Sequence, residues 1–189
     1  MRLIIGLGNP GKEYEKTRHN IGFMMLDNYV DYKKINTKWS TKFNGKYIKD
    51  KINGEETILL KPQSFMNLSG GVVKKYVDYF KIPIENVIVI SDDMDLFVGN
   101  FKIKDKGSCG GHNGLRDIEK NLGTSLYKRI KIGIAKDKSI DTKDYVLGKL
   151  SKEDLDIIFD LSKVINEVID DFYGMPFNDM MSKYNRKNR

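Results

Sequence analysis

The sequence predicts an α/β fold, in which a twisted, mixed β-sheet is flanked by helices on both faces of a single domain over residues 1–189. Short apolar runs typical of strands alternate along the chain with segments whose apolar residues recur at helical spacing. The β-branched run at residues 87–90 is typical of a strand buried on both faces. Asn53-Gly54, between two strand-like segments, indicates a tight hairpin.

The strands are predicted from residue patterns of period two or from continuous apolar runs. The first is a buried strand that leads into a Gly/Pro loop, the next two form the hairpin, and the fifth alternates polar and apolar residues. The predicted strands are residues 2–7, 46–52, 56–61, 87–90, 100–104 and 127–134.

The helices are predicted from apolar residues at helical spacing, at residues 21–32, 72–80 and 115–122. The longest helix opens at Ser151, and Asp154 stands where a capping box places its second member. One apolar face of that helix continues to Phe172, and a short tail helix ends in the basic residues 186–189.

Composition limits the classes of function. The net charge of +7 favours a polyanionic partner such as nucleic acid. The single cysteine, Cys109, allows no internal disulfide, as expected for a protein of the reducing cytoplasm. We expect neither a signal segment nor a membrane span, because no apolar run has the necessary length.

A candidate general base is His19, one of two histidines, in the loop that follows the first predicted strand. Asp92, Asp93 and Asp95 follow another strand, and the carboxyl ends of parallel strands meet at one edge of a sheet. Two interpretations stay open for these carboxylates. In the first, one of these carboxylates orients His19. In the second, all three bind Mg²⁺. The absence of a phosphate-binding motif favours the orientation of His19.

Three further segments have both a structural and a chemical interpretation. Residues 6–11 match the dinucleotide fingerprint G-x-G-x-x-G, but no helix is predicted at the last glycine, so a tight turn is favoured. Asn67 is either the N-cap of the following helix or a side chain that reads an amide or ester. Cys109 and His112 have the residue types of a nucleophilic pair, although the surrounding glycines favour close approach of backbone or substrate.

Four segments together resemble the bacterial peptidyl-tRNA hydrolase family: GLGNPGKEYEKTRHNIGF (6–23), KPQSFMNLSGG (61–71), SDDMDL (91–96) and GGHNGLRDI (110–118). The resemblance implies an enzyme that cleaves the ester between a peptide and the 3′ adenosine of tRNA, with no cofactor and no metal. It also implies peptidyl-tRNA as partner, bound through its acceptor stem and 3′ end, a monomeric state and a cytoplasmic location.

The resemblance assigns roles residue by residue. His19 is the general base, Asp92 holds and polarises it, and Asn9 discriminates blocked from unblocked aminoacyl groups. Asn67 or Asn113 is the candidate donor to the oxyanion. The residues implied to contact the tRNA end or the peptide are Tyr14, Phe65, Met66, Asn67 and Asn113, and the implied phosphate clamp is Lys104 with Lys131, where the family often has Arg.

Two other functions remain as alternatives. A plant organellar relative with the same motifs serves as an intron-splicing adaptor, and a Mg²⁺-dependent phosphoesterase would use Asp92, Asp93 and Asp95. Within the hydrolase interpretation, we expect residues 148–151 to gate the site, with the long helix after them as a lid.

Overall fold

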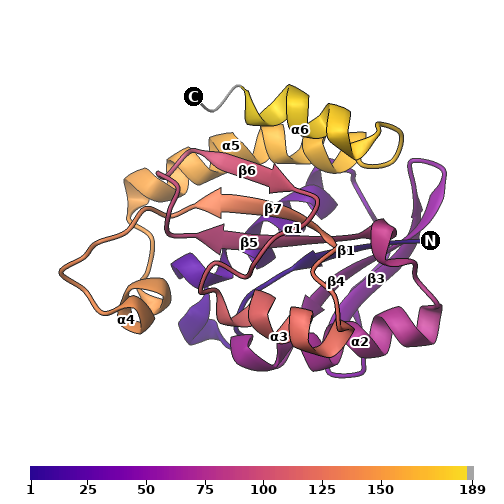
Figure 1. The fold of residues 1–189 in the computed structure, drawn as a ribbon, viewed down its shortest axis with the longest axis horizontal. Helices are drawn as coiled ribbons and strands as arrows, with labels where there is room; N and C mark the ends of the chain where they lie inside the picture. Colours follow the sequence, from indigo (N-terminus) through magenta and orange to yellow (C-terminus); the bar gives the residue numbers. More distant parts are fainter. Residues whose placement is uncertain (187–189) are drawn as a thin grey trace.

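The computed structural model describes residues 1–186, in which a seven-stranded sheet has the strand order β2-β3-β4-β1-β5-β7-β6 (Figure 1). The strands are β1 (Arg2–Gly6), β2 (Ser40–Lys42), β3 (Gly45–Ile52), β4 (Glu55–Pro62), β5 (Val87–Asp93), β6 (Phe101–Lys104) and β7 (Lys128–Gly133).

The pairing confirms the predicted mixed sheet. Strand β1 lies parallel to both β4 and β5, and β5 lies parallel to β7. The β2–β3–β4 ribbon and the β6–β7 pair are antiparallel. The carboxyl ends of β1, β4, β5 and β7 therefore share one edge of the sheet, which is where open α/β sheets bind ligands.

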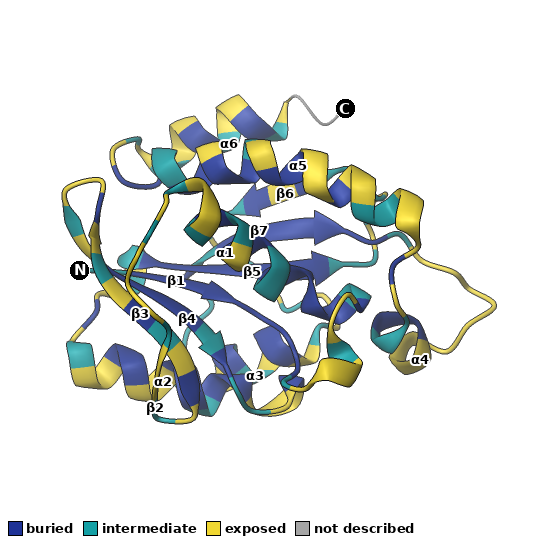
Figure 2. Ribbon diagram, turned by 180° about the vertical axis from the view of Figure 1, so that it is seen from behind, coloured by how far each residue is buried: buried dark blue, intermediate teal, exposed yellow. Residues whose placement is uncertain are grey.

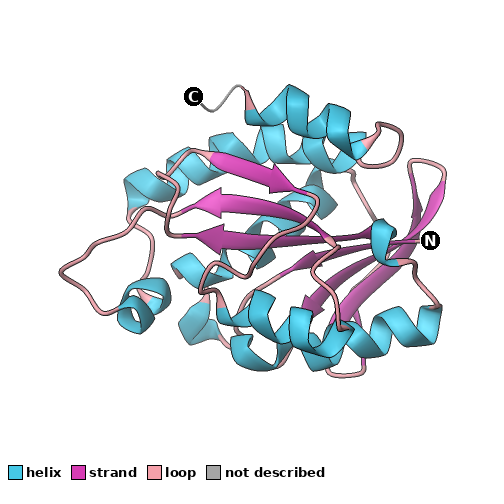
Figure 3. Cartoon of the chain, in the orientation of Figure 1, coloured by secondary structure: helices cyan, strands magenta, loops and turns pink. Residues whose placement is uncertain are grey.

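Helices cover both faces of the sheet, as predicted (Figures 1 and 3). One face is covered by α1 (Ile21–Tyr32), α5 (Lys152–Asp171) and α6 (Phe177–Asn185), and the other by α2 (Ser69–Phe80) and α3 (Asn113–Leu122). The short helix α4 (Thr142–Leu147) lies beyond the strand ends, where the arrowheads of β5 and β7 point towards it (Figure 1).

The period of two along each strand divides the core into two clusters. In β1, Ile4 packs in the cluster under α1 and α5, whereas Leu3 and Ile5 pack in the cluster under α2 and α3. All three side chains are fully buried, and the central strands are buried along their lengths (Figure 2). Burial of apolar surface on both faces thus fixes the sheet, and with it the ends of its strands.

Several boundaries differ from the sequence prediction. Strand β5 continues to Asp93 instead of ending at residue 90, because Ser91 and Asp92 keep pairing with β7. Helix α2 begins at Ser69 and has Leu68 at its N-cap position, so Asn67, which lies in a 3₁₀ turn, is not its cap. The three-residue β2 and six-residue α4 were not predicted, since neither is long enough to show a period.

The predicted lid is wrong. Helix α5 is part of the core, with Ile165 and Ile169 fully buried in the cluster that it shares with α1. Its predicted start is confirmed, because the Ser151 hydroxyl accepts the N–H of Asp154 at 3.1 Å. The basic end of the tail includes residues 187–189, which lie outside the described residues.

Candidate active site

A cavity of about 960 Å³ opens at the carboxyl ends of the strands. Its walls come from the loops after β1, β4 and β5, from the glycine-rich loop before α3, and from α4. The sequence-predicted residues that line it are Asn9, Tyr14, His19, Phe65, Met66, Asn67, Asp92, Asn113 and Lys131. The tertiary structure therefore gathers nine of the ten predicted site residues around one cavity, and Lys104 is the exception.

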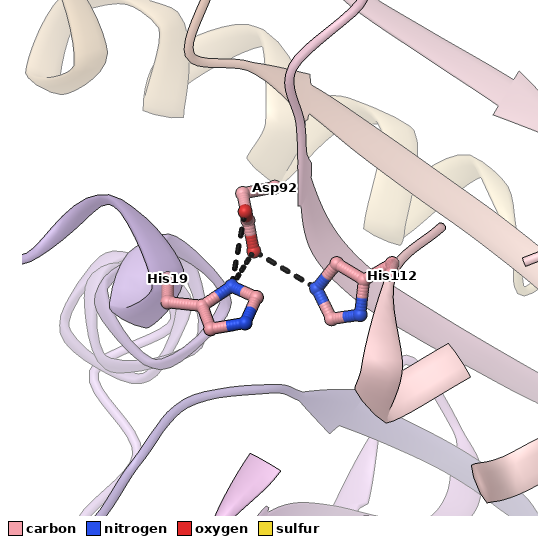
Figure 4. Close-up of side chains that lie close together, drawn as sticks. All are labelled: His19, Asp92 and His112. Atoms are coloured by element: carbon pink, nitrogen blue, oxygen red, sulfur yellow. Dashed lines mark hydrogen bonds and ion pairs between the residues drawn. The ribbon is translucent and has the colours of Figure 1, made fainter. Parts of the chain in front are cut away.

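His19 and Asp92 form a buried pair at this cavity (Figure 4). His19 lies in a 3₁₀ turn directly before α1, and its Nδ1 is 2.8 and 3.0 Å from the two carboxylate oxygens of Asp92 at the end of β5. Because an ionised carboxylate only accepts, Nδ1 carries the proton and Nε2 keeps its lone pair. That tautomer leaves Nε2 as a base in a cavity-lining side chain.

His112 is a second partner of Asp92, which the sequence interpretation missed (Figure 4). Its Nδ1 accepts the backbone N–H groups of Gly114 and Leu115, at 3.1 and 3.3 Å, and so caps the N-terminus of α3. Since Nδ1 accepts, the ring proton is on Nε2, which donates to Asp92 over 2.9 Å. The helix cap therefore fixes the tautomer with which His112 contacts the carboxylate.

The two imidazoles keep Asp92 ionised. Burial alone raises the pKa of this carboxyl, but the two histidines outweigh that effect and hold the pKa well below its usual range. The His19 and His112 rings lie 4.7 Å apart between centroids, and both residues line the cavity. A buried anion held by two N–H donors is suited to orienting one histidine and stabilising the positive charge that it gains as a base.

Asn9 is held by a second buried network. The side chain of Asn20 accepts the N–H of Asn9 at 2.8 Å and donates to its carbonyl at 2.9 Å. The Asn9 side-chain oxygen accepts the N–H of Met66 at 2.7 Å. Because the oxygen is occupied, the amide nitrogen of Asn9 is the group left to donate to a ligand in the cavity. Asn20, next to His19 in the chain, is another residue that the sequence interpretation missed.

The remaining predicted contacts lie around the cavity. Tyr14 and Phe65 make an edge-on aromatic contact with centroids 6.4 Å apart, and Phe65 is 57% exposed. Met66 is a buried residue of the same lining. Asn67 and Asn113 are exposed side chains of the lining, and the Asn113 side-chain oxygen accepts from Arg116.

The two predicted clamp lysines differ in position. Lys131 lines the cavity and pairs with Asp93 at 3.2 Å. Lys104, on the edge strand β6, is not in the lining. Partial burial and the neighbouring charges of Lys131 and Lys102 lower the pKa of Lys104. The two predicted cations are thus close enough to repel each other, a condition that a bound anion relieves.

The donor set does not fit a metal ion. Among residues 1–186, Asp92, Asp93 and Asp95 do not form a cluster of candidate ligands, and Asp93 instead pairs with Lys131. The cluster that does form is His19, Asp92 and His112, with ligand atoms within 4.8 Å of one another. A metal at His112 Nε2 would move the ring proton to Nδ1, against the two backbone N–H groups that Nδ1 accepts.

The dinucleotide interpretation is excluded by local structure, as predicted. Gly11 has φ of 117°, a conformation that favours glycine, and it leads into a three-residue 3₁₀ turn rather than a helix. The chain therefore presents no helix N-terminus to a pyrophosphate at this loop. Cys109 is a residue of the cavity lining, whereas the bonds of His112 go to Asp92 and to the start of α3.

Helix α4 contributes one wall of the cavity through residues such as Thr142, Lys143, Val146 and Leu147. No sequence signal pointed to this wall, because α4 has a single turn and a half of helix between loops. For His112, the sequence did contain a signal. Like His19, it lies in a loop that follows a predicted strand, and it stands just before a predicted helix, where a side chain can cap the helix.

Comparisons with known proteins agree with this arrangement. The family model described as peptidyl-tRNA hydrolase matches residues 3–189. A peptidyl-tRNA hydrolase of Listeria monocytogenes is 44% identical over 189 residues, which cover 99% of this chain and 100% of that protein. One of Lactobacillus acidophilus is 42% identical over 186 residues, covering 98% and 100%. The crystal structure of peptidyl-tRNA hydrolase from Acinetobacter baumannii superposes with a TM-score of 0.90 at 32% identity, covering 98% of this chain and 94% of that one. The chain therefore belongs to the peptidyl-tRNA hydrolase family.

Proposed function

We propose that this protein hydrolyses the ester between an N-blocked peptide and the 3′ adenosine of tRNA by means of a water activated by His19. The observation that carries the mechanism is the buried His19–Asp92 pair, in which Nδ1 is engaged and Nε2 remains a base at the cavity. An ester is already activated towards attack, so the chemistry requires no covalent nucleophile. General-base assistance of this kind contributes roughly 10²–10⁴-fold.

Each proton has a defined route in this mechanism. His19 Nε2 takes a proton from the water as the oxygen attacks the ester carbonyl carbon, and Asp92 stabilises the imidazolium. The tetrahedral intermediate then collapses by breaking the bond to the ribose 3′ oxygen. His19 returns the proton to that oxygen, so the products are a peptide with a free carboxyl group and a tRNA with a 3′ hydroxyl.

Amide donors serve the substrate around the reacting carbon. Asn9 is fixed by Asn20 and Met66 with its side-chain nitrogen available, which suits a donor to the carbonyl of a blocked amino acid. Asn67 or Asn113 is the donor to the oxyanion, where loss of one donor costs roughly 10²–10³-fold. Tyr14 and Phe65 offer aromatic faces to the terminal adenine, and Met66 lies beneath the reacting group.

Cations hold the tRNA end without reading its sequence. Lys131 exchanges its Asp93 partner for a phosphate, and Lys104, which stands outside the cavity lining, is the second cation of the proposed clamp. The net charge of +7 adds salt-dependent affinity for the acceptor stem. Phosphate binding independent of base identity suits an enzyme that accepts many tRNAs.

We further propose that residues 1–189 act as one monomeric catalytic domain in the cytoplasm. Within residues 1–186, no helix is long and apolar enough to cross a membrane. Light scattering at working concentration tests the monomer, and a dimer mass would overturn it.

The test of function compares an N-acetylaminoacyl-tRNA with its unblocked counterpart, in the presence of EDTA, for wild type and His19→Ala. We expect the wild type to cleave the blocked ester only, and His19→Ala to lose that activity while remaining folded, with a lower melting temperature because Asp92 loses one of its two partners. No cleavage by folded wild type would favour a binding module such as the splicing adaptor. Activity that EDTA abolishes would favour the metal-dependent alternative.

A further inference from the structure

Helix α4 is fixed to the catalytic turn through Arg18, the residue before His19. The Arg18 guanidinium lies over the Tyr145 ring, 4.1 Å from its centroid, and donates to the Tyr145 carbonyl at 3.0 Å. The Arg18 backbone N–H donates to the carbonyl of Gly148, also at 3.0 Å. One residue thus contacts both the last turn of α4 and the segment that follows it.

Neighbouring backbone bonds strengthen the same connection. The N–H of Leu150 donates to the Lys16 carbonyl at 2.9 Å, and Thr17 and Lys149 form an antiparallel bridge. Residues 148–150 of the segment predicted as a gate, residues 148–151, are therefore bonded to residues 16–18. The segment that enters α4, residues 135–141, begins at the half-buried Ala135 and is otherwise exposed. The exit of α4 is thus held by several backbone bonds, and Tyr145 is held in addition through its hydroxyl, which donates to the Ile134 carbonyl.

Gly148 has a packing reason to be glycine. Its φ is −72°, which any residue adopts, but a Cβ there would lie 2.6 Å from a terminal nitrogen of Arg18. The glycine therefore gives the guanidinium the space from which it reaches Tyr145. An alanine at position 148 would displace the flexible end of Arg18 while leaving the α4 backbone conformation allowed.

The wall that Arg18 holds is chemically suited to a peptide. Val146 and Leu147 are apolar residues of the α4 side of the cavity, and Met94 is a third apolar member of the lining. Such surfaces bind peptide side chains, whereas the cation of the sheet, Lys131, lies where the tRNA phosphate is proposed to bind. In the proposed function the reacting ester lies at His19, another residue of the same lining.

We propose that Arg18 is a positioning residue that sets the α4 wall against His19 and so determines how the enzyme binds the peptide beyond the esterified residue. The proposal rests on the proposed function and adds a specificity determinant to it. Arg18 does not line the cavity itself. Displacement of the wall weakens the binding of a long peptide in the ground state and the transition state alike, so KM rises while kcat is kept.

The experiment measures kcat and KM for two substrates, N-acetylaminoacyl-tRNA and an N-acetylated tripeptidyl-tRNA. The variants are Arg18→Met, which keeps the aliphatic stem, Arg18→Lys, which keeps the charge, and Gly148→Ala, which displaces the guanidinium from a different position. Arg2→Met is the matched control, since Arg2 also stacks on aromatic rings and donates to a backbone carbonyl, at residue 173. Melting temperatures of all variants accompany the kinetics.

For Arg18→Met and Gly148→Ala we expect KM to rise roughly tenfold with the tripeptidyl substrate, which corresponds to the loss of one cation–π contact and its hydrogen bond. With the acetylaminoacyl substrate, KM should change by less than about threefold, because that substrate has no peptide to contact the α4 wall, and kcat should be unchanged with both substrates. Arg18→Lys should recover part of the loss in affinity for the tripeptidyl substrate. Arg2→Met shows no dependence on peptide length.

A loss equal for both substrates, a fall in kcat, or unchanged kinetics in the Arg18 and Gly148 variants would overturn the proposal. If Arg18→Met does not fold, Gly148→Ala and Arg18→Lys decide the question through the same comparison. A wild type that cleaves neither substrate would refute the proposed function instead, before any variant is compared.

Discussion

At the scale of single residues, the site depends on which nitrogen of each histidine carries its proton. Asp92 fixes the tautomer of His19, and the first turn of α3 fixes that of His112. The two rings consequently present N–H groups to one carboxylate, and the basic nitrogen of His19 remains for the substrate. A proton shifted on either ring would leave a buried donor or acceptor without a partner, which costs about 1–3 kcal/mol.

The roles of His112 can be separated by two substitutions. His112→Ala removes both the cap of α3 and the contact with Asp92, whereas His112→Asn keeps a capping side chain and loses the contact. We expect kcat to fall roughly tenfold in both variants, from the loss of one hydrogen bond to a charged group. Both variants lose stability with the Asp92 contact, and His112→Ala loses about 1 kcal/mol of unfolding free energy more than His112→Asn, because it also loses the cap. Kinetics and thermal melts check this, and unchanged kcat in both variants would contradict it.

The lowered pKa of Asp92 predicts a pH dependence of stability. Because this carboxyl binds its proton less readily when folded, its ionised form stabilises the protein above the unfolded pKa, and that stabilisation disappears as the pH falls towards the folded pKa. We expect wild type to be more stable than Asp92→Asn at neutral pH, with the difference shrinking below about pH 4. Denaturant melts at several pH values measure it, and a difference independent of pH would refute the argument.

At the scale of elements, short segments rather than long helices make the site. The 3₁₀ turns at Arg18–Asn20 and Met66–Leu68 carry His19 and Met66, and α4 closes one side. The long helices α1 and α5 instead bury their apolar faces against the sheet. Chemistry is thus placed on short loops that rigid strands and helices position.

The structural role of α5 gives a test of the rejected lid. Ser151→Ala removes the hydroxyl that accepts the N–H of Asp154 and is expected to lower the unfolding free energy by about 1 kcal/mol. Because α5 contributes no residue to the cavity lining, kcat and KM remain as in wild type. Ser151→Asp, which keeps a capping acceptor, should restore stability. If KM changed in Ser151→Ala under conditions in which the variant is fully folded, α5 would act as a lid after all.

At the scale of the whole molecule, charge and topology act together. Four parallel strands bring their carboxyl ends to one edge, where Lys131 and the histidine pair lie, and the excess of lysine and arginine supplies long-range attraction for a polyanion. Affinity for tRNA should therefore depend on salt more than on base sequence.

Two lysines of the same strand make this measurable. Lys131 lies at the cavity, whereas Lys128 lies at the opposite end of β7, over the ring of Phe177. In a plot of log(kcat/KM) against log salt, Lys131→Ala should reduce the slope by about one, because one phosphate contact is lost. Lys128→Ala should keep the wild-type slope. If the salt dependence had the same slope in Lys131→Ala and Lys128→Ala, Lys131 would not be the residue that contacts the phosphate.

The sequence by itself determined the layered α/β fold, because period-two runs and helical stripes specify which face of each element is buried. It also determined His19 and Asp92 as candidates, since both follow predicted strands, whereas Asn9 became a candidate through the family resemblance of residues 6–23. The end of β5 was missed because its polar residues are kept in the strand by pairing with β7. Ser91, for example, pairs with Lys131, which lies 40 residues further along the chain.

Only the tertiary structure decided the rest of the site. His112 contacts a carboxylate 20 residues away, Asn20 braces Asn9, and Arg18 holds an α4 that lies more than 120 residues further along the chain. Such contacts depend on where the loops lie once the sheet has formed, and the hydrophobic periodicity within one segment does not predict them. The residue types for catalysis were readable in the chain, whereas their partners were set by packing between distant segments.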